Sequence, residues 1–258
     1  MKVERECKIV SKEQVGDAVY MTLEVGDMIR ASFRAPGQFV HIRCGEGLLL
    51  RRPISACSCM EDEPDDLLSI VFEVRGEGTR WLAGRELGDS LDVLGLAGNG
   101  FDLKPEGRYL LVGGGIGIPP MLGCAQYTGG RATAILGGRS RDKIILEDFF
   151  REDCAKVLCA TDDGSLGHHG FVDALVRREL SEDRGYDGVL ACGPKPMLRN
   201  VAKVAEEFGI PCQVSMEERM GCGVGACLVC ACDMADGSRK HVCKDGPVFD
   251  SREVDWDA

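Results

Sequence analysis

The most informative part of this sequence is Met220-Gly221-Cys222-Gly223-Val224-Gly225-Ala226-Cys227-Leu228-Val229-Cys230, which Cys243 follows further along the chain. The cysteine spacing is C-x4-C-x2-C-x12-C. The glycines and the alanine between the cysteines allow the backbone to wrap tightly and to aim N–H groups at a negatively charged group. Two irons need four thiolates, two on each iron, so the pattern predicts a [2Fe–2S] cluster held by Cys222, Cys227, Cys230 and Cys243.

A structural zinc site with four cysteine ligands is the alternative interpretation. Zinc also takes four thiolates, but its usual signature is two separate short knuckles that supply two ligands each. Here three cysteines share one glycine-rich loop and the fourth stands alone, which is the spacing of plant-type [2Fe–2S] proteins. The spacing therefore favours iron over zinc, and it predicts a protein that moves electrons one at a time.

Composition and charge narrow the class of protein. The chain has 258 residues, 44% of them apolar, which is enough for two or three modest domains. Its formal net charge of −11 argues against general binding of nucleic acid, which needs a basic face. We find neither an apolar run long enough for a transmembrane helix nor the apolar core of a signal peptide near Met1. We therefore expect a cytoplasmic protein without a membrane partner.

The fourteen cysteines are consistent with a reducing compartment. In that setting, cysteines are metal ligands or buried thiols rather than disulfides. Cys232 falls outside the cluster spacing, and we interpret it as a buried thiol beside the cluster.

The first hundred residues alternate short β-rich runs with turn residues. The runs are 19–25, 39–43, 68–74 and 90–95, and a helix is expected between the last two, from Thr79 to about Arg85. Regularly spaced short strands predict a small closed antiparallel barrel, to which we assign residues 1–102.

The pattern changes after Gly100 to alternating strands and helices. Strand-like runs occur at 109–112, 132–136, 156–160 and 188–192, with helices expected at 146–152, 171–180 and 196–208. This alternation predicts a parallel sheet covered on both faces, to which we assign residues 103–213. The cysteine segment, residues 214–258, follows. The fold class is therefore a multi-domain β plus α/β protein with a C-terminal cluster segment.

Two glycine-containing loops follow predicted parallel strands. Gly113-Gly114-Gly115-Ile116-Gly117-Ile118-Pro119-Pro120 lies at a strand-to-helix turn, and Cys192-Gly193-Pro194-Lys195-Pro196 follows a later strand. Ligands bind at the carboxyl ends of such strands, and helix N-termini attract phosphate. Because both loops open at the same edge of the sheet, together they predict a cleft for a dinucleotide.

The barrel half contains Arg51-Arg52-Pro53-Ile54-Ser55 and Gly76-Glu77-Gly78-Thr79. Arginine can bind a phosphate through two parallel N–H bonds. A surface arginine pair before a strand is the alternative, but the small residues and hydroxyl of the second stretch favour an anion site.

These motifs resemble those of the ferredoxin–NAD(P) reductase superfamily. Arg52-Pro53-Ile54-Ser55 resembles its R-x-Y-[ST] flavin motif, with Ile54 in place of the usual aromatic residue, and the two glycine loops resemble its pyridine-nucleotide motifs. The stretch Ser215 to Cys227 narrows the resemblance to the electron-transfer subunits of class 1B dihydroorotate dehydrogenases. The resemblance spans nearly the whole chain with the motifs in the same order.

The resemblance implies a barrel that binds FAD, an α/β domain that binds NAD as co-substrate, and a cluster segment. Carried over by position, the implied flavin residues are Arg52, Pro53, Ile54, Ser55, Val71, Phe72, Glu73, Gly78 and Thr79. The implied nucleotide residues are Gly114, Gly115, Gly117, Cys192, Gly193 and Pro194. Ser55 and Cys192 would lie nearest the flavin and the nicotinamide, although Cys192 is equally well explained as a small buried thiol.

The resemblance also implies a partner, because the sequence has no dihydroorotate site of its own. A separate FMN-containing catalytic subunit would oxidise dihydroorotate in pyrimidine biosynthesis, in a heterotetramer of two copies of each chain. The alternatives are a subunit of another flavin–iron–sulfur complex, such as a ferredoxin-dependent transhydrogenase, sulfite reductase or hydrogenase, or a non-redox zinc module. Arg139 and Arg141 favour NADP, whereas Asp162 and Asp163 favour NAD; the resemblance favours NAD.

Overall fold

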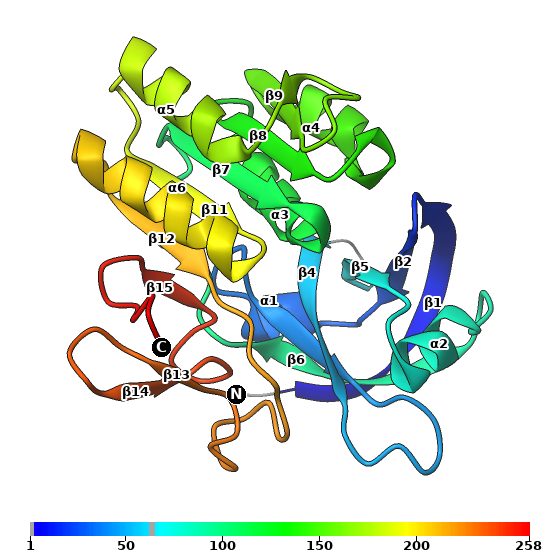
Figure 1. The fold of residues 1–258 in the computed structure, drawn as a ribbon. Helices are drawn as coiled ribbons and strands as arrows, with labels where there is room; N and C mark the ends of the chain where they lie inside the picture. The colour runs from blue at the N-terminus through cyan, green and yellow to red at the C-terminus, as the bar shows by residue number, and fades with distance from the viewer. Residues whose placement is uncertain (1–2, 62–64) are drawn as a thin grey trace.

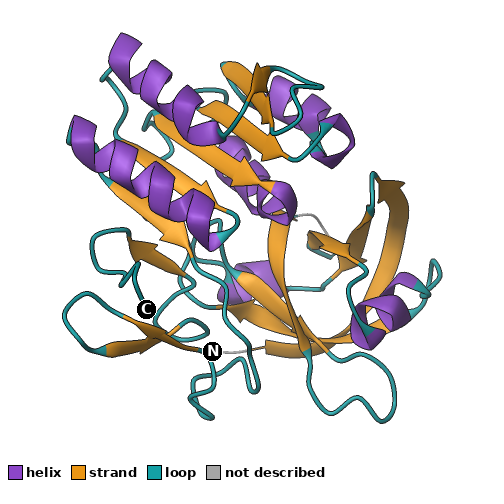
Figure 2. Cartoon of the chain, in the orientation of Figure 1, coloured by secondary structure: helices purple, strands orange, loops and turns teal. Residues whose placement is uncertain are grey.

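The computed structural model describes residues 3–61 and 65–258, so Met1, Lys2 and residues 62–64 of the expected 1–102 domain lie outside it. Figure 1 shows three parts: a barrel built by the N-terminal residues, a sheet flanked by helices built by the central residues, and a C-terminal segment beside both. Figure 2 shows that the barrel is built from strands joined by loops and short helices, whereas the central part alternates strand and helix. The fold class expected from the sequence is confirmed.

The barrel is a closed antiparallel sheet with the strand order β1-β2-β5-β4-β3-β6. Its helices are α1 (Met28–Ser32) and α2 (Glu77–Ala83). The strands are β1 (Val3–Val15), β2 (Ala18–Glu24), β3 (Phe39–Ile42), β4 (Arg52–Met60), β5 (Leu67–Glu73) and β6 (Ser90–Ala97). Closure leaves the described barrel with no free strand edge.

Alternation along the barrel strands separates two environments. Val40, Ile42, Ile54 and Phe72 point into the barrel, where they form one core with other apolar side chains. Phe39 belongs instead to a core shared with the sheet and the cysteine segment. Successive side chains of a strand point to opposite faces, so the outer face of β3 is covered by the rest of the molecule.

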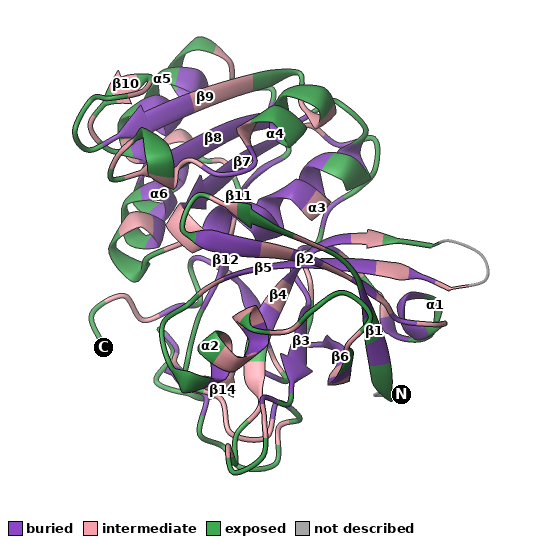
Figure 3. Ribbon diagram, turned by 90° about the vertical axis from the view of Figure 1, so that its right-hand side faces the viewer, coloured by how far each residue is buried: buried purple, intermediate pink, exposed green. Residues whose placement is uncertain are grey.

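The central sheet has the order β10-β9-β8-β7-β11-β12-β15, in which only β15 (Val248–Asp250) is antiparallel to its neighbour. Figure 3 shows its strands buried beneath helices with exposed outer surfaces. The strands are β7 (Tyr109–Gly114), β8 (Thr133–Gly138), β9 (Lys156–Thr161), β10 (His168–His169), β11 (Gly188–Cys192) and β12 (Cys212–Ser215). The helices are η1 (Gly115–Gly117), α3 (Ile118–Thr128), η2 (Arg141–Lys143), α4 (Glu147–Asp153), α5 (Val172–Glu182) and α6 (Lys195–Phe208).

Local sequence explains the ends of the two helices that follow the glycine loops. Helices α3 and α6 each have proline in the first turn, where its missing N–H costs nothing. They end at Gly129 and Gly209, both left-handed, the conformation that glycine adopts without a steric penalty. No helix among the described residues is long and apolar enough to cross a membrane.

The cysteine segment returns to the central sheet. It contains the hairpin β13 (Ala231–Asp233) and β14 (Arg239–His241), and then β15 (Val248–Asp250), which pairs with β12. Strand β12 runs across the boundary expected between residues 213 and 214, and that boundary stays a prediction.

Candidate functional site

The four predicted cluster cysteines lie together as two pairs. Cys222 N–H donates to Cys227 Sγ at 3.4 Å, and Cys227 N–H donates to Cys222 Sγ at 3.4 Å. In the second pair, Cys243 N–H donates to Cys230 Sγ at 3.4 Å. In the part of the chain that the structure describes, no three His, Cys, Asp or Glu side chains converge as ligands of a single metal ion. Two pairs are the arrangement that two irons require.

The loop between the pairs aims backbone N–H groups at the sulfurs. Val224 and Ala226 donate to Cys222 Sγ at 3.4 and 3.2 Å, and Gly225 donates to Cys243 Sγ at 3.1 Å. Gly223 and Gly225 make this wrapping possible with φ of +67° and +80°. The donor set fits an anionic iron–sulfur cluster, whose sulfurs accept such hydrogen bonds.

The same N–H groups favour the thiolate of Cys222. Burial raises the pKa of this thiol, but donation from Val224, Cys227 and Ala226 outweighs burial and lowers it to about 6. Across the site, burial and the neighbouring Cys230 raise the pKa of Cys243 to about 12. Cys222 is therefore largely a thiolate and ready to bind metal at neutral pH, whereas metal must displace the proton of Cys243.

The two pairs differ in exposure. Cys230 and Cys243 are buried, whereas Cys227 is exposed beside Leu228 and Val229, which are 59% and 57% exposed. One side of the cluster loop therefore faces solvent. Cys232 is buried next to the loop, as the sequence predicts.

Asn99, which follows the last barrel strand, binds the backbone just after the cluster ligand Cys243. Its side-chain amide donates to the carbonyls of Lys244 and Asp245 at 3.2 and 3.0 Å, and its backbone N–H donates to the Gly246 carbonyl at 2.7 Å. These three residues directly follow Cys243. Asn99 carries no local motif, so sequence reasoning could not single it out.

The structure brings the two predicted flavin stretches into contact. Arg52 opens β4, and its guanidinium lies against Gly78 at the start of α2, where a Cβ would come within 2.7 Å of Cζ. Thr79 Oγ1 accepts the N–H groups of Arg75 and Gly76 at 2.9 and 3.1 Å, which caps the helix. Because Gly78 has no side chain, the guanidinium can lie against the backbone there, and an arginine so held can bind a phosphate.

The remaining predicted flavin residues fall into two groups. Ile54 and Phe72 are buried in the barrel core, whereas Val71 packs in the core of the central domain. Pro53, Ser55 and Glu73 keep exposed surface on the outside of the barrel. Glu73 is ion-paired with Arg75. Only the partly exposed residues can offer side chains to a ligand on the outside of the barrel. Ile54 and Phe72 could contact such a ligand only through their backbone atoms.

The two predicted nucleotide loops meet at the carboxyl edge of the sheet. Gly113 and Cys192 are register partners on β7 and β11. Gly117 and Gly193 are so close that a Cβ on Gly117 would lie 2.7 Å from Gly193 N. Gly114 faces Met197 and Pro194, whereas Gly115 has φ of +55° and open space before it. The loops thus form one glycine-lined edge, as a dinucleotide cleft needs.

Cys192 is a neutral thiol at this edge. Burial raises its pKa to about 12, although a hydrogen bond with Ser215 opposes the shift. A thiol with this pKa is uncharged at neutral pH, so it can contact a bound nicotinamide without acting as a nucleophile.

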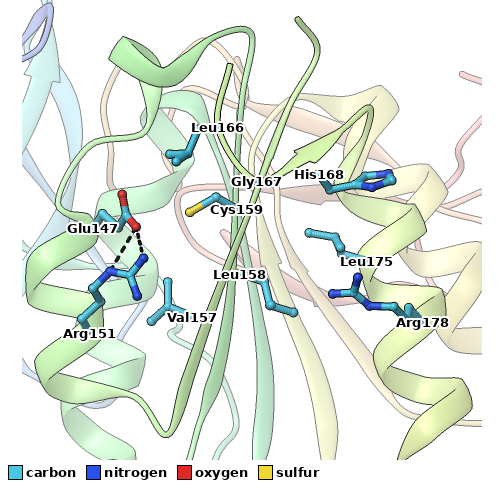
Figure 4. A pocket seen from close by; sticks show the side chains of 10 residues that line it. All are labelled: Glu147, Arg151, Val157, Leu158, Cys159, Leu166, Gly167, His168, Leu175 and Arg178. Carbon is cyan, nitrogen blue, oxygen red and sulfur yellow. Dashed lines mark hydrogen bonds and ion pairs between the residues drawn. The ribbon is translucent and has the colours of Figure 1, made fainter. Parts of the chain in front are cut away.

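A separate pocket of about 400 Å³ lies at the β9 edge of the sheet. Figure 4 shows Glu147 and Arg151 of α4 on one side of the strand and Leu175 and Arg178 of α5 on the other. None of the predicted cofactor residues lines it. The pocket is therefore distinct from the glycine-lined edge and from the cysteine loop.

Comparison with known proteins agrees with this geometry. Residues 217–255 match the model of the iron–sulfur cluster binding domain of dihydroorotate dehydrogenase B. The dihydroorotate dehydrogenase B (NAD(+)) electron transfer subunit of Caldanaerobacter subterraneus is 37% identical over 98% of this chain and 99% of its own length. The protein of the same name from Bacillus caldolyticus is 40% identical over 95% and 96%.

The chain belongs to the family of dihydroorotate dehydrogenase B electron transfer subunits. The family resemblance expected from the motifs is thereby confirmed. A solved structure of an NADH-dependent reduced ferredoxin–NADP oxidoreductase is also similar, with a TM-score of 0.86, 32% identity, and coverage of 98% of this chain and 91% of that one. This chain and the matched chain of that oxidoreductase therefore share one fold over nearly their whole lengths.

Proposed function

We propose that this chain is an oxidoreductase subunit that carries electrons from a dihydroorotate-oxidising partner to NAD, in the synthesis of pyrimidines. The observation that carries the proposal is the paired arrangement of Cys222 with Cys227 and of Cys230 with Cys243, in a loop bound to the barrel and to the nucleotide-binding sheet. One cluster site thus touches both parts that would hold the other redox groups.

The electron balance requires both kinds of redox group. Oxidation of dihydroorotate to orotate releases two electrons and two protons, and NAD takes up two electrons and one proton as a hydride. When bound, the [2Fe–2S] cluster carries one electron at a time, and FAD collects two and passes them on as a pair.

The barrel, residues 1–102, supplies the FAD site. Arg52 contributes the charge for a phosphate, and Gly78, on which the guanidinium packs, and Thr79, which caps the following helix, lie beside it. Ser55 keeps exposed surface on the outer face of β4, which supports a role for its hydroxyl at the flavin ring edge. Pro53, Ile54, Val71, Phe72 and Glu73 complete the proposed set.

The central domain, residues 103–213, supplies the NAD site. Gly114, Gly115, Gly117, Gly193 and Pro194 form the edge over which the pyrophosphate and nicotinamide lie, and Cys192 borders the nicotinamide. Asp163 N–H donates to the Arg139 carbonyl at 3.1 Å, so the arginines and the aspartates that bear on NADP or NAD lie together. Family membership favours NAD.

The cluster segment, residues 214–258, faces the partner. Exposed Leu228 and Val229 beside Cys227 form an apolar edge on this side. The partner of the proposal is an FMN-containing dihydroorotate dehydrogenase catalytic subunit, in a cytoplasmic heterotetramer of two copies of each chain. Short distances between redox groups require the cluster to lie close to that subunit.

A second candidate function rests on the similarity to the ferredoxin–NADP oxidoreductase structure. In that case the partner would belong to a ferredoxin-dependent transhydrogenase, and dihydroorotate would not be a substrate of the complex. The barrel, the sheet and the cluster segment would keep their roles.

Purification of the tagged full chain with its native partner tests the two functions. Recovery of an FMN-containing chain that oxidises dihydroorotate with NAD supports the first. Recovery of a complex that ignores dihydroorotate but reduces ferredoxin or NADP supports the second. A colourless chain containing zinc and no iron contradicts both.

A further inference from the structure

His41 lies where the barrel meets the cluster loop. It is the third residue of β3 and is fully buried. Val40 and Ile42 on either side point into the barrel core, so His41 points outward with Phe39. The rings of Phe39 and His41 meet edge to face with centroids 6.4 Å apart. Phe39 belongs to the core that also contains Cys230 and Cys243.

The imidazole of His41 lies directly against Gly223, the residue after the cluster ligand Cys222. A Cβ on Gly223 would come within 2.5 Å of His41 Nδ1 and 3.0 Å of Cε1. Gly223 also has φ of +67°, a conformation that other residues rarely adopt. Position 223 therefore favours glycine for two reasons: its backbone has a positive φ, and the His41 ring occupies the space that a side chain would need.

The other side of His41 is fixed to the proposed flavin strand. His41 is the register partner of Pro53 on β4, between Arg52 and Ile54. Arg51 donates to the His41 carbonyl at 3.3 Å and to the Asp92 carbonyl at 3.0 Å, which holds β3 to β6. His41 thus connects the strand that carries the flavin motif with the loop that carries a cluster ligand.

We propose that His41 is a positioning residue that sets the Cys222 side of the cluster against the flavin-binding strand and thereby tunes the cluster's reduction potential. The inference rests on the proposed cluster and FAD sites. Its physical basis is that groups just outside the metal ligands orient them, and that polarity and hydrogen bonding around the sulfurs set the potential. The N–H groups donated to Cys222 Sγ come from residues 224, 226 and 227, so a shift of Gly223 moves this donor set.

Variants of His41 separate its polarity from its bulk. His41→Asn keeps a polar atom near the position of Nδ1, and His41→Phe keeps a ring without polar atoms. The full chain, prepared anaerobically, is titrated with reductant while the electron paramagnetic resonance of the cluster and the visible absorption of FAD are recorded. We expect His41→Phe to change the cluster's one-electron equilibrium roughly tenfold, a shift of about 59 mV, and His41→Asn to restore most of the wild-type potential. The FAD potential should stay at its wild-type value in both.

Substitutions of Gly223 and Gly225 provide a second test, in which the contact with His41 is changed from the side of the cluster loop. Gly223→Ala and Gly225→Ala both place an L-residue at positive φ, but the nearest atoms to a Cβ at Gly225 belong to the Lys244 side chain rather than to the His41 ring. We expect Gly223→Ala to shift the cluster signal and potential more than Gly225→Ala does. Adding His41→Ala should relieve part of the Gly223→Ala effect and leave the Gly225→Ala effect unchanged.

Different outcomes would contradict the role of His41 and the proposed function on which it rests. A wild-type chain that contains no iron and sulfide contradicts the proposed cluster itself. If the wild-type chain has a normal cluster and His41→Phe has the same cluster potential and spectrum, the role of His41 is overturned while the cluster site stands. Strictly additive effects of His41→Ala and Gly223→Ala would also overturn it.

Discussion

The guanidinium of Arg52 lies directly over Gly78, so that a Cβ at Gly78 would come within 2.7 Å of Cζ and 2.9 Å of Nη2. The two residues are distant in sequence, and each belongs to a separate stretch predicted to bind flavin. Their contact puts a charged donor directly against the backbone at Gly78, where any side chain larger than hydrogen would collide with the guanidinium. An arginine in this position can bind a phosphate group through charge-assisted hydrogen bonds.

Loss of the arginine should weaken FAD binding without affecting the cluster. We expect Arg52→Ala to lose a charge-assisted hydrogen bond of about 1.5–3 kcal/mol, measured as weaker FAD retention in ultrafiltration of the purified chain. Gly78→Ala should act in the same direction, because its Cβ displaces the guanidinium. Iron content serves as the control, and full FAD occupancy in both variants would contradict the assignment.

Removal of any cluster ligand should abolish the cluster while FAD stays bound. Cys222→Ala and Cys243→Ala each leave one iron with a single protein thiolate, so iron and sulfide should fall to background in chemical analysis. Cys232→Ala is the matched control, since Cys232 is buried beside the loop but outside the two pairs. A Cys232→Ala chain that loses its cluster, or a Cys222→Ala chain that keeps it, would show that the ligand set is wrong.

The glycine edge should govern NADH oxidation. In Gly193→Ala the new Cβ would lie 2.5 Å from Met197 Cε, at a φ of +156°. We expect a raised KM for NADH with ferricyanide as acceptor, while FAD and iron contents stay normal. Cys192→Ala should leave the pH dependence of this reaction between pH 6 and 9 unchanged, because the pKa of the thiol is about 12. A step in the wild-type profile that disappears in Cys192→Ala would contradict a neutral thiol.

Buried thiols should make the chain less stable at alkaline pH. Burial raises the pKa of Cys7 from 9.0 to about 12. Above pH 9 the unfolded chain loses this proton and the folded chain keeps it, so the free energy of unfolding falls by about 1.4 kcal/mol per pH unit per thiol until pH reaches about 12. Below pH 9 the contribution of Cys7 is fully present. Denaturant unfolding between pH 8 and 10.5 should show a shallower decline in Cys7→Ala than in wild type, and equal slopes would refute the shift.

The chain alone should catalyse only the NADH side of the proposed reaction. It should oxidise NADH with an artificial acceptor, yet leave dihydroorotate unchanged until the candidate catalytic subunit is added, because we find no dihydroorotate site in its sequence. Production of orotate is followed by absorbance, with each protein alone as the control. Turnover of dihydroorotate by the chain alone would reveal an active site that its motifs do not indicate.

Local patterns predicted most of the central domain. The strands near Leu111, Ile135 and Leu190 are short apolar runs ending in glycine or cysteine, and the structure places each in the buried sheet. The cysteine spacing likewise lies within one short stretch, so its pairing could be anticipated without knowledge of the fold. Features encoded over a few neighbouring residues are those that a sequence reveals.

Features that depend on closure or on distant contacts could not be predicted. The longest strand, β1, has an outer face of polar residues such as Glu4, Glu6 and Lys8, and therefore shows little hydrophobic run of its own. Asn99 and His41 contact the cluster segment across more than a hundred residues of sequence. Neither has a neighbouring motif, because their partners are supplied by the folding of another domain.

The pairing of β15 with β12 makes the cluster region an insertion rather than a tail. Residues 216–247 leave the sheet at Ser215 and rejoin it at Val248, which is the register partner of Ser215. An engineer who wished to move this redox module to another protein would therefore need two adjacent splice points on neighbouring strands. The host would need a parallel sheet with a free edge to receive the returning strand. A fusion at one junction would transfer the cysteines without the anchor that closes their loop.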